Sequence, residues 1–441
     1  MKRIFLVLLV NLALFLAQAQ DGFTQSATEI AARMGVGWNL GNTFEAGNNA
    51  NNFTNKGGLG AETSWQQTKT TQEVIDYVKA SGFSSIRIPC AWVMGHISNA
   101  STYEIDAEWM DRVKEVVDYC IKADLYVIIN QHWDGGWLEN NIKATGASKT
   151  KNQEVLKAIW TQIAEAFKDY DEHLLFAGLN EPNADNQTET NALLEYEQIF
   201  INSVRATGGN NSLRMLIVQG PSTDIEKTVK YYNTFPTDPA GEGHLMMEVH
   251  YYNPWQFWGM EKDESWSNVY YYWGEGNHVA GSKHNPTWDC EEAAMERLLD
   301  QMKVKFVDKK IPVILGEFGA NWRNISSQKG ESQEKHNASI QLHYYMLTKL
   351  ALERGMVPMM WDTNYCSQPS MTIIDRKNLK IYNTFMSDGI KQAVTDFTND
   401  IPIIETTEQI ANIYDLQGHQ IDSNKAQKGL FIKNGKKYIA L

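Results

Sequence analysis

The sequence is poor in cysteine and in positive charge. Four of its 441 residues are cysteine (Cys90, Cys120, Cys290 and Cys366), and their spacing matches no disulfide framework or metal-binding motif. We expect mostly buried thiols, with a Cys90–Cys366 bridge as the alternative, because each of these two closely follows a predicted strand. The formal net charge of −13 disfavours nucleic acid and anionic membrane surfaces as partners.

Long uncharged hydrophobic runs are missing beyond the first residues. Two basic residues precede an apolar run over residues 4–16, and the small-x-small sequence Ala17–Ala19 follows. This pattern is typical of a signal peptide, and the run is shorter than the roughly 20 residues that a membrane-spanning helix needs. We therefore predict that residues 1–19 are a signal peptide rather than an anchor. The protein would be secreted, and either extracellular or associated with the cell surface, with the periplasm as an alternative.

Aromatic residues, in contrast, are abundant. The chain has 14 Trp and 19 Tyr, and 43% of its residues are hydrophobic, which is enough for one large domain with appendages. Aromatic rings can stack on the apolar faces of sugars, although filling a large core would explain them equally well. The composition suits a neutral, hydroxyl-rich ligand.

Short apolar segments alternate with longer amphipathic ones along the chain. Eight segments are predicted strands: 35–40, 84–88, 125–130, 174–179, 214–219, 245–249, 312–316 and 357–361. Apolar residues at three- and four-residue spacing predict helices between them: 71–81, 107–122, 153–168, 190–206, 289–307 and 332–353. Eight such units predict an α/β fold of the (β/α)8 TIM barrel type over residues 20–398. An open doubly wound sheet is the competing fold, but Gly41–Phe44 supplies no glycine-rich phosphate turn after the first strand.

A change of composition near Asp400 marks the end of the predicted barrel. Residues 399–441 alternate short apolar and polar runs, with turn residues at Gln417–Gly418 and Asn434–Gly435. We predict a linker and a small β-rich C-terminal tail.

Two glutamates lie where a barrel enzyme places its chemistry, at the carboxyl ends of strands. Glu181 follows the fourth predicted strand and Glu317 follows the seventh, on opposite sides of the barrel mouth. Glycosidic bond cleavage needs one carboxylic acid to protonate the leaving oxygen and one carboxylate to attack or to activate water. We predict Glu181 as the acid/base and Glu317 as the nucleophile. A single strand-end glutamate would more simply be a salt-bridge partner.

The neighbouring residues suit this division of labour. Asn180 can donate a hydrogen bond to a sugar 2-hydroxyl, and Arg87 and Tyr252 can hold the Glu317 carboxylate ionised. His132 and His250 can each hold a hydroxyl or orient a carboxylate, or serve a purely structural role. No cluster at metal-ligand spacing accompanies them, so we expect no metal and no cofactor.

Several tryptophans are candidate stacking platforms. Trp361 closes the last predicted strand, under the expected position of the reacting sugar. Four more crowd the long loop after the sixth strand, and a buried mini-core is the alternative for them: Trp255, Trp258, Trp266 and Trp273. Weaker candidates of the same kind are Trp38, Trp65, Trp92, Trp133 and Trp137.

At these residues the chain resembles glycoside hydrolase family 5. The resemblance covers roughly residues 30–395 and rests on motifs in a fixed order: GWNLGN (37–42), IRIP (86–89), INQH (129–132), LNEP (179–182), VHYY (249–252), LGEFG (315–319) and the strand-eight Trp361. Asn39 and the loop tryptophans Trp255 and Trp258 are further candidates for substrate binding or support. The resemblance implies a retaining mechanism without a metal and a shared active-site set. That set is Arg87, His132, Asn180, Glu181, His250, Tyr252, Glu317 and Trp361.

The chain departs from the family pattern at Trp133, where many members carry a second histidine after His132, and the substrate contact there is in doubt. The opening around GAETSW (60–65) resembles the branch that contains endoglucanases, xyloglucanases and mixed-linkage glucanases. The tail resembles C-terminal sorting modules of exported bacterial enzymes, with a plain β-hairpin cap as the alternative. If it is a sorting module, secretion machinery at the cell surface is a partner.

We therefore predict a secreted, retaining endo-β-1,4-glucanase that binds and cuts cellulose or a related β-glucan. Within the same family, a xyloglucan-specific endoglucanase, a mixed-linkage glucanase and a mannanase remain open. A non-catalytic barrel that only binds polysaccharide is an alternative hypothesis, but such a protein has no use for both glutamates. A barrel enzyme for phosphorylated metabolites is disfavoured by the signal peptide and the acidic charge.

Overall fold

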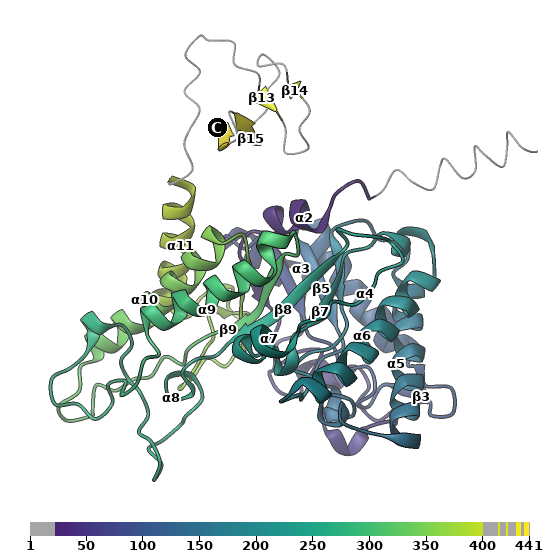
Figure 1. The fold of residues 1–441 in the computed structure, drawn as a ribbon. Coiled ribbons are helices and arrows are strands. Elements are labelled where there is room, and N and C mark those ends of the chain that lie inside the picture. The colour runs from purple at the N-terminus through teal and green to yellow at the C-terminus, as the bar shows by residue number, and fades with distance from the viewer. Residues whose placement is uncertain (1–22, 400–412, 415–419, 422–428, 434–435, 441) are drawn as a thin grey trace, which may run out of the picture.

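The computed structural model describes residues 23–399, 413–414, 420–421, 429–433 and 436–440. Its centre is a closed barrel of eight parallel strands with helices around it (Figure 1). The strands follow one another around the barrel in chain order, and the last pairs with the first. They are β1 (Gly37–Asn39), β2 (Ser85–Ile88), β5 (Tyr126–Asn130), β6 (Leu174–Ala177), β7 (Leu216–Gln219), β8 (Leu245–Tyr251), β9 (Val313–Phe318) and β10 (Val357–Met360).

Every barrel strand is buried along its whole length, because helices cover its outer face and side chains fill the barrel inside. In β5, Val127 and Ile129 belong to the large core shared with the helices, whereas Tyr126 and Ile128 belong to the inner cluster. The helices are α2 (Ala27–Met34), α3 (Gln72–Ala80), α4 (Ala107–Lys122), α5 (Gly146–Ala166), α6 (Gln187–Ala206), α7 (Ile225–Tyr231), α8 (Trp255–Trp258), α9 (Glu292–Lys305), α10 (Gln333–Glu353) and α11 (Thr384–Asn399).

Helix α2 closes the amino end of the barrel. Its apolar residues Ala27, Ile30 and Met34 pack in the inner cluster, and the backbone N–H of Ala27 donates to the carbonyl of Gly243, just before β8. A capping box between Ser26 and Glu29 starts this helix by satisfying backbone groups at its first turn. The opposite, carboxyl end is left to the loops, including the one that contains α8 (Figure 1).

The eight predicted strands and the (β/α)8 barrel are confirmed, with shifted boundaries. β8 and β9 run further than predicted, so His250 and Glu317 lie inside strands rather than after them. α5 begins at Gly146 rather than at residue 153. The prediction missed its first turns because they are mostly exposed and carry no apolar repeat. The predicted helix over 107–122 has the predicted bounds, whereas α2, α7, α8 and α11 lie outside the predicted helix ranges.

Two long connections, over 42–70 and 251–287, contain short helical elements. The first contains short 3-10 helices at Asn49–Asn51 and Leu59–Thr63, and the second contains α8 and a 3-10 helix at Glu275–Asn277. Minor antiparallel pairs lie outside the barrel: β3 (Ile97–Asn99) with β4 (Glu104–Ile105), and β11 (Ile374–Asp375) with β12 (Lys380–Ile381).

The four cysteines are free thiols. Cys90, Cys120 and Cys290 are buried and Cys366 is exposed, so the alternative of a Cys90–Cys366 bridge is wrong. Within the described part of the chain, none of the helices combines the length and the apolar character that a membrane crossing requires.

The C-terminal part forms a small antiparallel sheet, as predicted for a β-rich appendage. Its strand order is β14 (Gln420–Ile421), β13 (Ile413–Tyr414), β15 (Gly429–Lys433) and β16 (Lys436–Ala440). The predicted signal peptide and most of the linker lie outside the described residues, so the domain boundaries at 19 and 398 stay predictions.

Candidate active site

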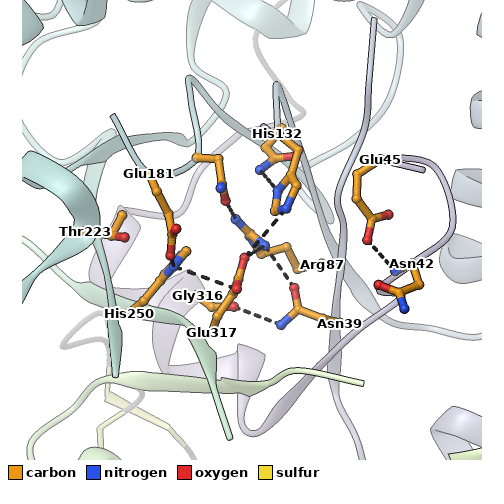
Figure 2. A network of polar contacts seen from close by, with 12 residues as sticks. Asn39, Asn42, Glu45, Arg87, His132, Glu181, Thr223, His250, Gly316 and Glu317 are labelled. Atoms are coloured by element: carbon orange, nitrogen blue, oxygen red, sulfur yellow. Dashed lines mark hydrogen bonds and ion pairs between the residues drawn. The ribbon is translucent and has the colours of Figure 1, made fainter. Parts of the chain in front are cut away.

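Glu181 and Glu317 face each other at the carboxyl end of the barrel. Glu181 follows β6 and Glu317 lies near the end of β9, and one oxygen of each carboxylate lies within 4.8 Å of the other (Figure 2). Both line a cavity of about 450 Å³. The cavity is also lined by His250, Tyr252, Trp258 and Trp361.

Both oxygens of Glu317 are held by hydrogen bonds. Arg87 on β2 donates from Nη1 to Oε1 at 2.9 Å, and the Tyr252 hydroxyl donates to Oε2 at 3.0 Å. Only 6% of Glu317 is exposed. Burial raises the pKa of Glu317, and the positive charges of His250 and Arg87 oppose that increase. The carboxylate is therefore fixed in position and depends on these two cations for its charge.

His250 is a cation between carboxylates. Its Nδ1 lies 2.8 Å from Oε1 of Glu181, and its Nε2 lies 3.3 Å from Oε1 of Glu248. Burial alone would lower the pKa of His250, but Glu317, Glu181 and Glu248 raise it to about 10. His250 is also the register partner of Glu317 across β8 and β9, next to an irregularity in the ladder after Val249.

Glu181 is the more accessible of the two glutamates, with 40% of its side chain exposed. Burial of its carboxyl end would raise the pKa, but the hydrogen bond and the charge of His250 outweigh this effect and hold the pKa of Glu181 below its ordinary value. Thr223, from the loop after β7, lies beside Glu181 and His250 (Figure 2).

His132 differs from His250 in charge. Burial, together with the charges of Arg87 and His250, lowers the pKa of His132 well below its ordinary value, so its imidazole is neutral. Its ring lies parallel to that of Trp361, with the ring centroids 5.7 Å apart, and its Nε2 is 4.0 Å from Oε1 of Glu317.

Two asparagines brace Arg87 rather than lying free in the cavity. Asn39 accepts from Nη1 of Arg87 at 3.0 Å and donates to the carbonyl of Gly316 at 2.8 Å (Figure 2). The amide oxygen of Asn180 accepts from Nη2 of Arg87 at 2.9 Å. Both asparagines are thus oriented by the residue that holds Glu317.

The predicted tryptophan platforms divide into exposed and buried rings. Trp255, Trp266 and Trp65 are 48%, 64% and 46% exposed, and Trp258 packs against Tyr252 with ring centroids 4.4 Å apart. Trp133 is half-buried and lies outside the cavity lining. The platform prediction is wrong for rings that the core encloses: Trp38, Trp92, Trp137 and Trp273.

Residues that the sequence did not single out complete the site. Glu248 on β8 is fully buried and lies 3.0 Å from Nε of Arg87 as well as next to His250. An acidic residue in an apolar strand, two positions before a predicted site histidine and so on the same strand face, was the available signal. Ser222 and Thr223 line the cavity with φ values of 55° and 46°, a backbone conformation that residues other than glycine rarely adopt and that is least common for a β-branched residue such as Thr223.

The site also has a geometry that could accept a metal ion. Glu181, His250 and Glu317 offer ligand atoms that all lie within 4.8 Å of one another. In the described structure these atoms already pair with one another, since Nδ1 of His250 is hydrogen-bonded to Glu181. The absence of a metal requirement stays a prediction.

A parallel barrel with two facing glutamates at its carboxyl end is the arrangement of a two-carboxylate glycoside hydrolase. The family model described as cellulase (glycosyl hydrolase family 5) matches residues 46–367. The chain therefore belongs to glycosyl hydrolase family 5.

The relatives are glucanases. A xyloglucan-specific endo-β-1,4-glucanase of Bacteroides ovatus is 38% identical over 77% of the chain, and the match spans 65% of that relative's length. Endoglucanase A of Paenibacillus barcinonensis is 34% identical, with 86% of this chain and 92% of the relative covered. Among solved structures, a xyloglucan-specific β-1,4-glucanase from a ruminal metagenomic library in complex with XXLG is 44% identical. It has a TM-score of 0.76, with 87% of this chain and 100% of that chain covered.

Proposed function

We propose that the protein is a retaining endo-β-1,4-glucanase that works by double displacement. The observation that carries this proposal is the separation of the two carboxylates, with an oxygen of Glu181 within 4.8 Å of an oxygen of Glu317. Retaining enzymes place their carboxyl groups about 5 to 5.5 Å apart, whereas inverting enzymes need roughly 6.5 to 9.5 Å to admit a water molecule. The short separation supports retention.

The surroundings of the two glutamates support their assignment. A nucleophile has to be held still and ionised, and Glu317 receives a hydrogen bond on each oxygen from Arg87 and Tyr252. An acid/base has to reach both the leaving oxygen and the incoming water, and the half-exposed side chain of Glu181 meets this need. We therefore assign Glu317 as nucleophile and Glu181 as acid/base.

In the first step Glu181 gives its proton to the glycosidic oxygen while an oxygen of Glu317 bonds to the anomeric carbon and the glycosidic bond breaks. In the second step Glu181 takes a proton from water, the water oxygen bonds to the anomeric carbon, and Glu317 leaves. Formation of the glycosyl ester removes the negative charge of Glu317, which lowers the pKa of Glu181. Glu181 therefore stays deprotonated after the first step and can act as the base in the second.

His250 has to release Glu181 for the first step, since their hydrogen bond favours the ionised form of Glu181. The same Nδ1 lies 3.9 Å from Oε2 of Glu317. A small rotation of the imidazole toward Glu317 would free Glu181 to carry its proton and would stabilise the nucleophile as a carboxylate. We expect the neutral His132 and the remaining N–H of Asn180 to hold sugar hydroxyls.

We infer a β-1,4-linked glucan backbone as the substrate. Exposed tryptophans such as Trp255 and Trp266 suit stacking on successive sugars, and the relatives named above are endoglucanases and xyloglucanases. Xyloglucan is the second candidate. The observation that favours it is the 44% identity to a xyloglucan-specific enzyme whose full length is covered.

A substrate panel tests this proposal. The purified chain and Glu181→Gln are incubated with carboxymethylcellulose, xyloglucan, mixed-linkage β-glucan and glucomannan, and the initial rates of reducing-end release are compared. We expect fast cleavage of one glucan and a loss of about 10²- to 10⁴-fold in the variant. Binding without cleavage by the unaltered chain would contradict the proposed enzyme and indicate a polysaccharide-binding barrel. Fastest cleavage of glucomannan would indicate a mannanase.

Retention and the nucleophile have their own test. Proton NMR of the first-formed product should show the β-anomer, because two displacements restore the configuration at the anomeric carbon. Glu317→Gln should be inactive yet still fold, with a cooperative unfolding transition. An α-anomer as first product would refute double displacement.

We also propose that the protein is exported. The pattern of residues 1–19 supports a cleaved signal peptide. N-terminal sequencing of the enzyme from the medium or the cell surface tests this and should begin after Ala19. A variant lacking residues 399–441 that stays behind in the periplasm would support a sorting role for the tail, whereas unchanged release would reduce the tail to an accessory sheet.

A further inference from the structure

Glu139 connects the loop after β5 to the segment that carries Glu181. Its Oε2 accepts a hydrogen bond from Nδ2 of Asn180 at 3.1 Å and another from the backbone N–H of Glu181 at 3.0 Å. The backbone carbonyl of Glu139 accepts from the N–H of Asn183 at 3.0 Å. One residue thus makes three hydrogen bonds to the four-residue segment 180–183.

This segment has little other support on that side. It follows the last ladder residue of β6 and belongs to no helix or strand, so its backbone groups need partners from elsewhere. Arg87 fixes the amide oxygen of Asn180, which turns the amide nitrogen toward Glu139. On the far side, the carbonyl of Pro182 accepts from Ser222. Glu139 and Ser222 therefore clamp the backbone that aims Glu181.

Glu139 also adds a charge beside the reacting carboxylates. The titratable groups that face it are Glu181, at the end of β6, and Glu317, on β9. Burial raises the pKa of Glu139 to about 7, with a smaller contribution from the charge of Glu181. Glu139 is thus neutral in mild acid and negative in mild alkali. A negative Glu139 opposes loss of the proton from Glu181, because like charges disfavour each other's ionised forms.

We propose that Glu139 is a positioning residue for the acid/base: its carboxylate aims the Asn180–Glu181 segment, and its negative charge opposes loss of the proton from Glu181. This inference rests on the proposed role of Glu181. In this proposal Glu139 does not contact the substrate and acts only through Asn180 and Glu181.

Two variants separate the two effects. Glu139→Gln keeps an oxygen that can accept from Asn180 and Glu181 but removes the charge, whereas Glu139→Ala removes both. Glu108→Gln on the exposed face of α4 removes the same charge away from the site and is the matched control. Thermal unfolding shows whether each variant is folded before its kinetics are compared.

The first measurement is the pH profile of kcat on the preferred glucan. Glu139→Gln should match the wild type in mild acid and lose activity above about pH 7, with its alkaline limb moved down by about one pH unit. Glu139→Ala should lose about 10- to 100-fold in kcat at all pH values with KM little changed, because the acid/base is misplaced. Glu108→Gln should follow the wild type.

The second measurement uses an activated substrate, 2,4-dinitrophenyl β-cellobioside, whose leaving group needs no proton. If Glu139 acts through the acid, Glu139→Ala should lose much less kcat/KM on this substrate than on the glucan. Equal losses on both substrates, or an unshifted limb in Glu139→Gln, would overturn the inference while leaving the proposed function intact. A wild type that cleaves no glucan would overturn both, and this outcome is recognised before any variant is measured.

Discussion

The imidazole of His250 lies 2.8 Å from the carboxylate of Glu181, measured from Nδ1 to Oε1. Three carboxylates around His250 raise its pKa to about 10 against the effect of burial, so the ring is positive at neutral pH. The arrangement gives both candidate catalytic glutamates a common counter-charge, and their protonation states depend on it.

Replacing His250 with asparagine should therefore move the whole activity bell to higher pH. The cation lowers the pKa of both glutamates, so its removal raises both, and each limb of the bell should rise by about one pH unit. The measurement is kcat/KM as a function of pH. His173→Asn, a partly exposed histidine on the loop before β6, serves as the control. An unmoved bell would show that His250 does not set these ionisations.

Replacing Glu248 with glutamine should destabilise the protein. Glu248 is buried between Arg87 and His250, and removing one partner of such a network costs about 3 kcal/mol or more. Burial would raise the pKa of Glu248, but Arg87 and His250 hold it below its ordinary value, so its charge stabilises the fold above the unfolded-state pKa and is lost in acid. Urea unfolding should show a deficit at neutral pH that narrows as the pH falls. Glu108→Gln should show no deficit.

Removal of metal ions should leave the activity unchanged. The proposed mechanism uses only the two carboxylates, although Glu181, His250 and Glu317 could together hold an ion. The test is the initial rate on the preferred glucan after dialysis against EDTA, with and without added calcium, magnesium or zinc. If dialysis abolished the rate and one metal restored it, the double-displacement scheme would need a metal.

The loop tryptophans should separate into binding and structural residues. Trp255→Ala should weaken substrate binding by about 3- to 10-fold and leave thermal unfolding unchanged, because its ring is half exposed. Trp273→Ala should cost about 3 to 5 kcal/mol of stability, since its ring is fully buried. The measurements are KM on the glucan and urea unfolding of both variants. A Trp255 variant that binds like the wild type would remove it from the substrate contacts.

The barrel was predictable because each buried strand is a short apolar run between polar segments. Helix α2 escaped notice because it has only eight residues, which is too short for a clear apolar repeat. The start of α5 was missed because a helical turn whose residues face solvent has no apolar repeat to reveal it. Helix α4, with an apolar face along its whole length, was predicted without error.

Strand ends showed where the chemistry gathers, but not how its charges balance. Glu181, Glu317 and Arg87 could be proposed from their places at or just after strand ends, whereas Glu248 was hidden inside an apolar strand and Glu139 in a loop without a pattern. Tryptophan counts could not separate Trp255 at the surface from Trp38 in the core, since burial depends on contacts between distant segments. The pairing of His250 with three carboxylates likewise depends on the closed barrel.

The packing of α2 against the amino end of the barrel places this helix on the face opposite the cavity (Figure 1). A surface or a second protein joined to the chain ahead of α2 would leave the cavity turned outward. The fold is thus suited to immobilisation through its amino end, with long polymer chains still free to enter the groove from solution.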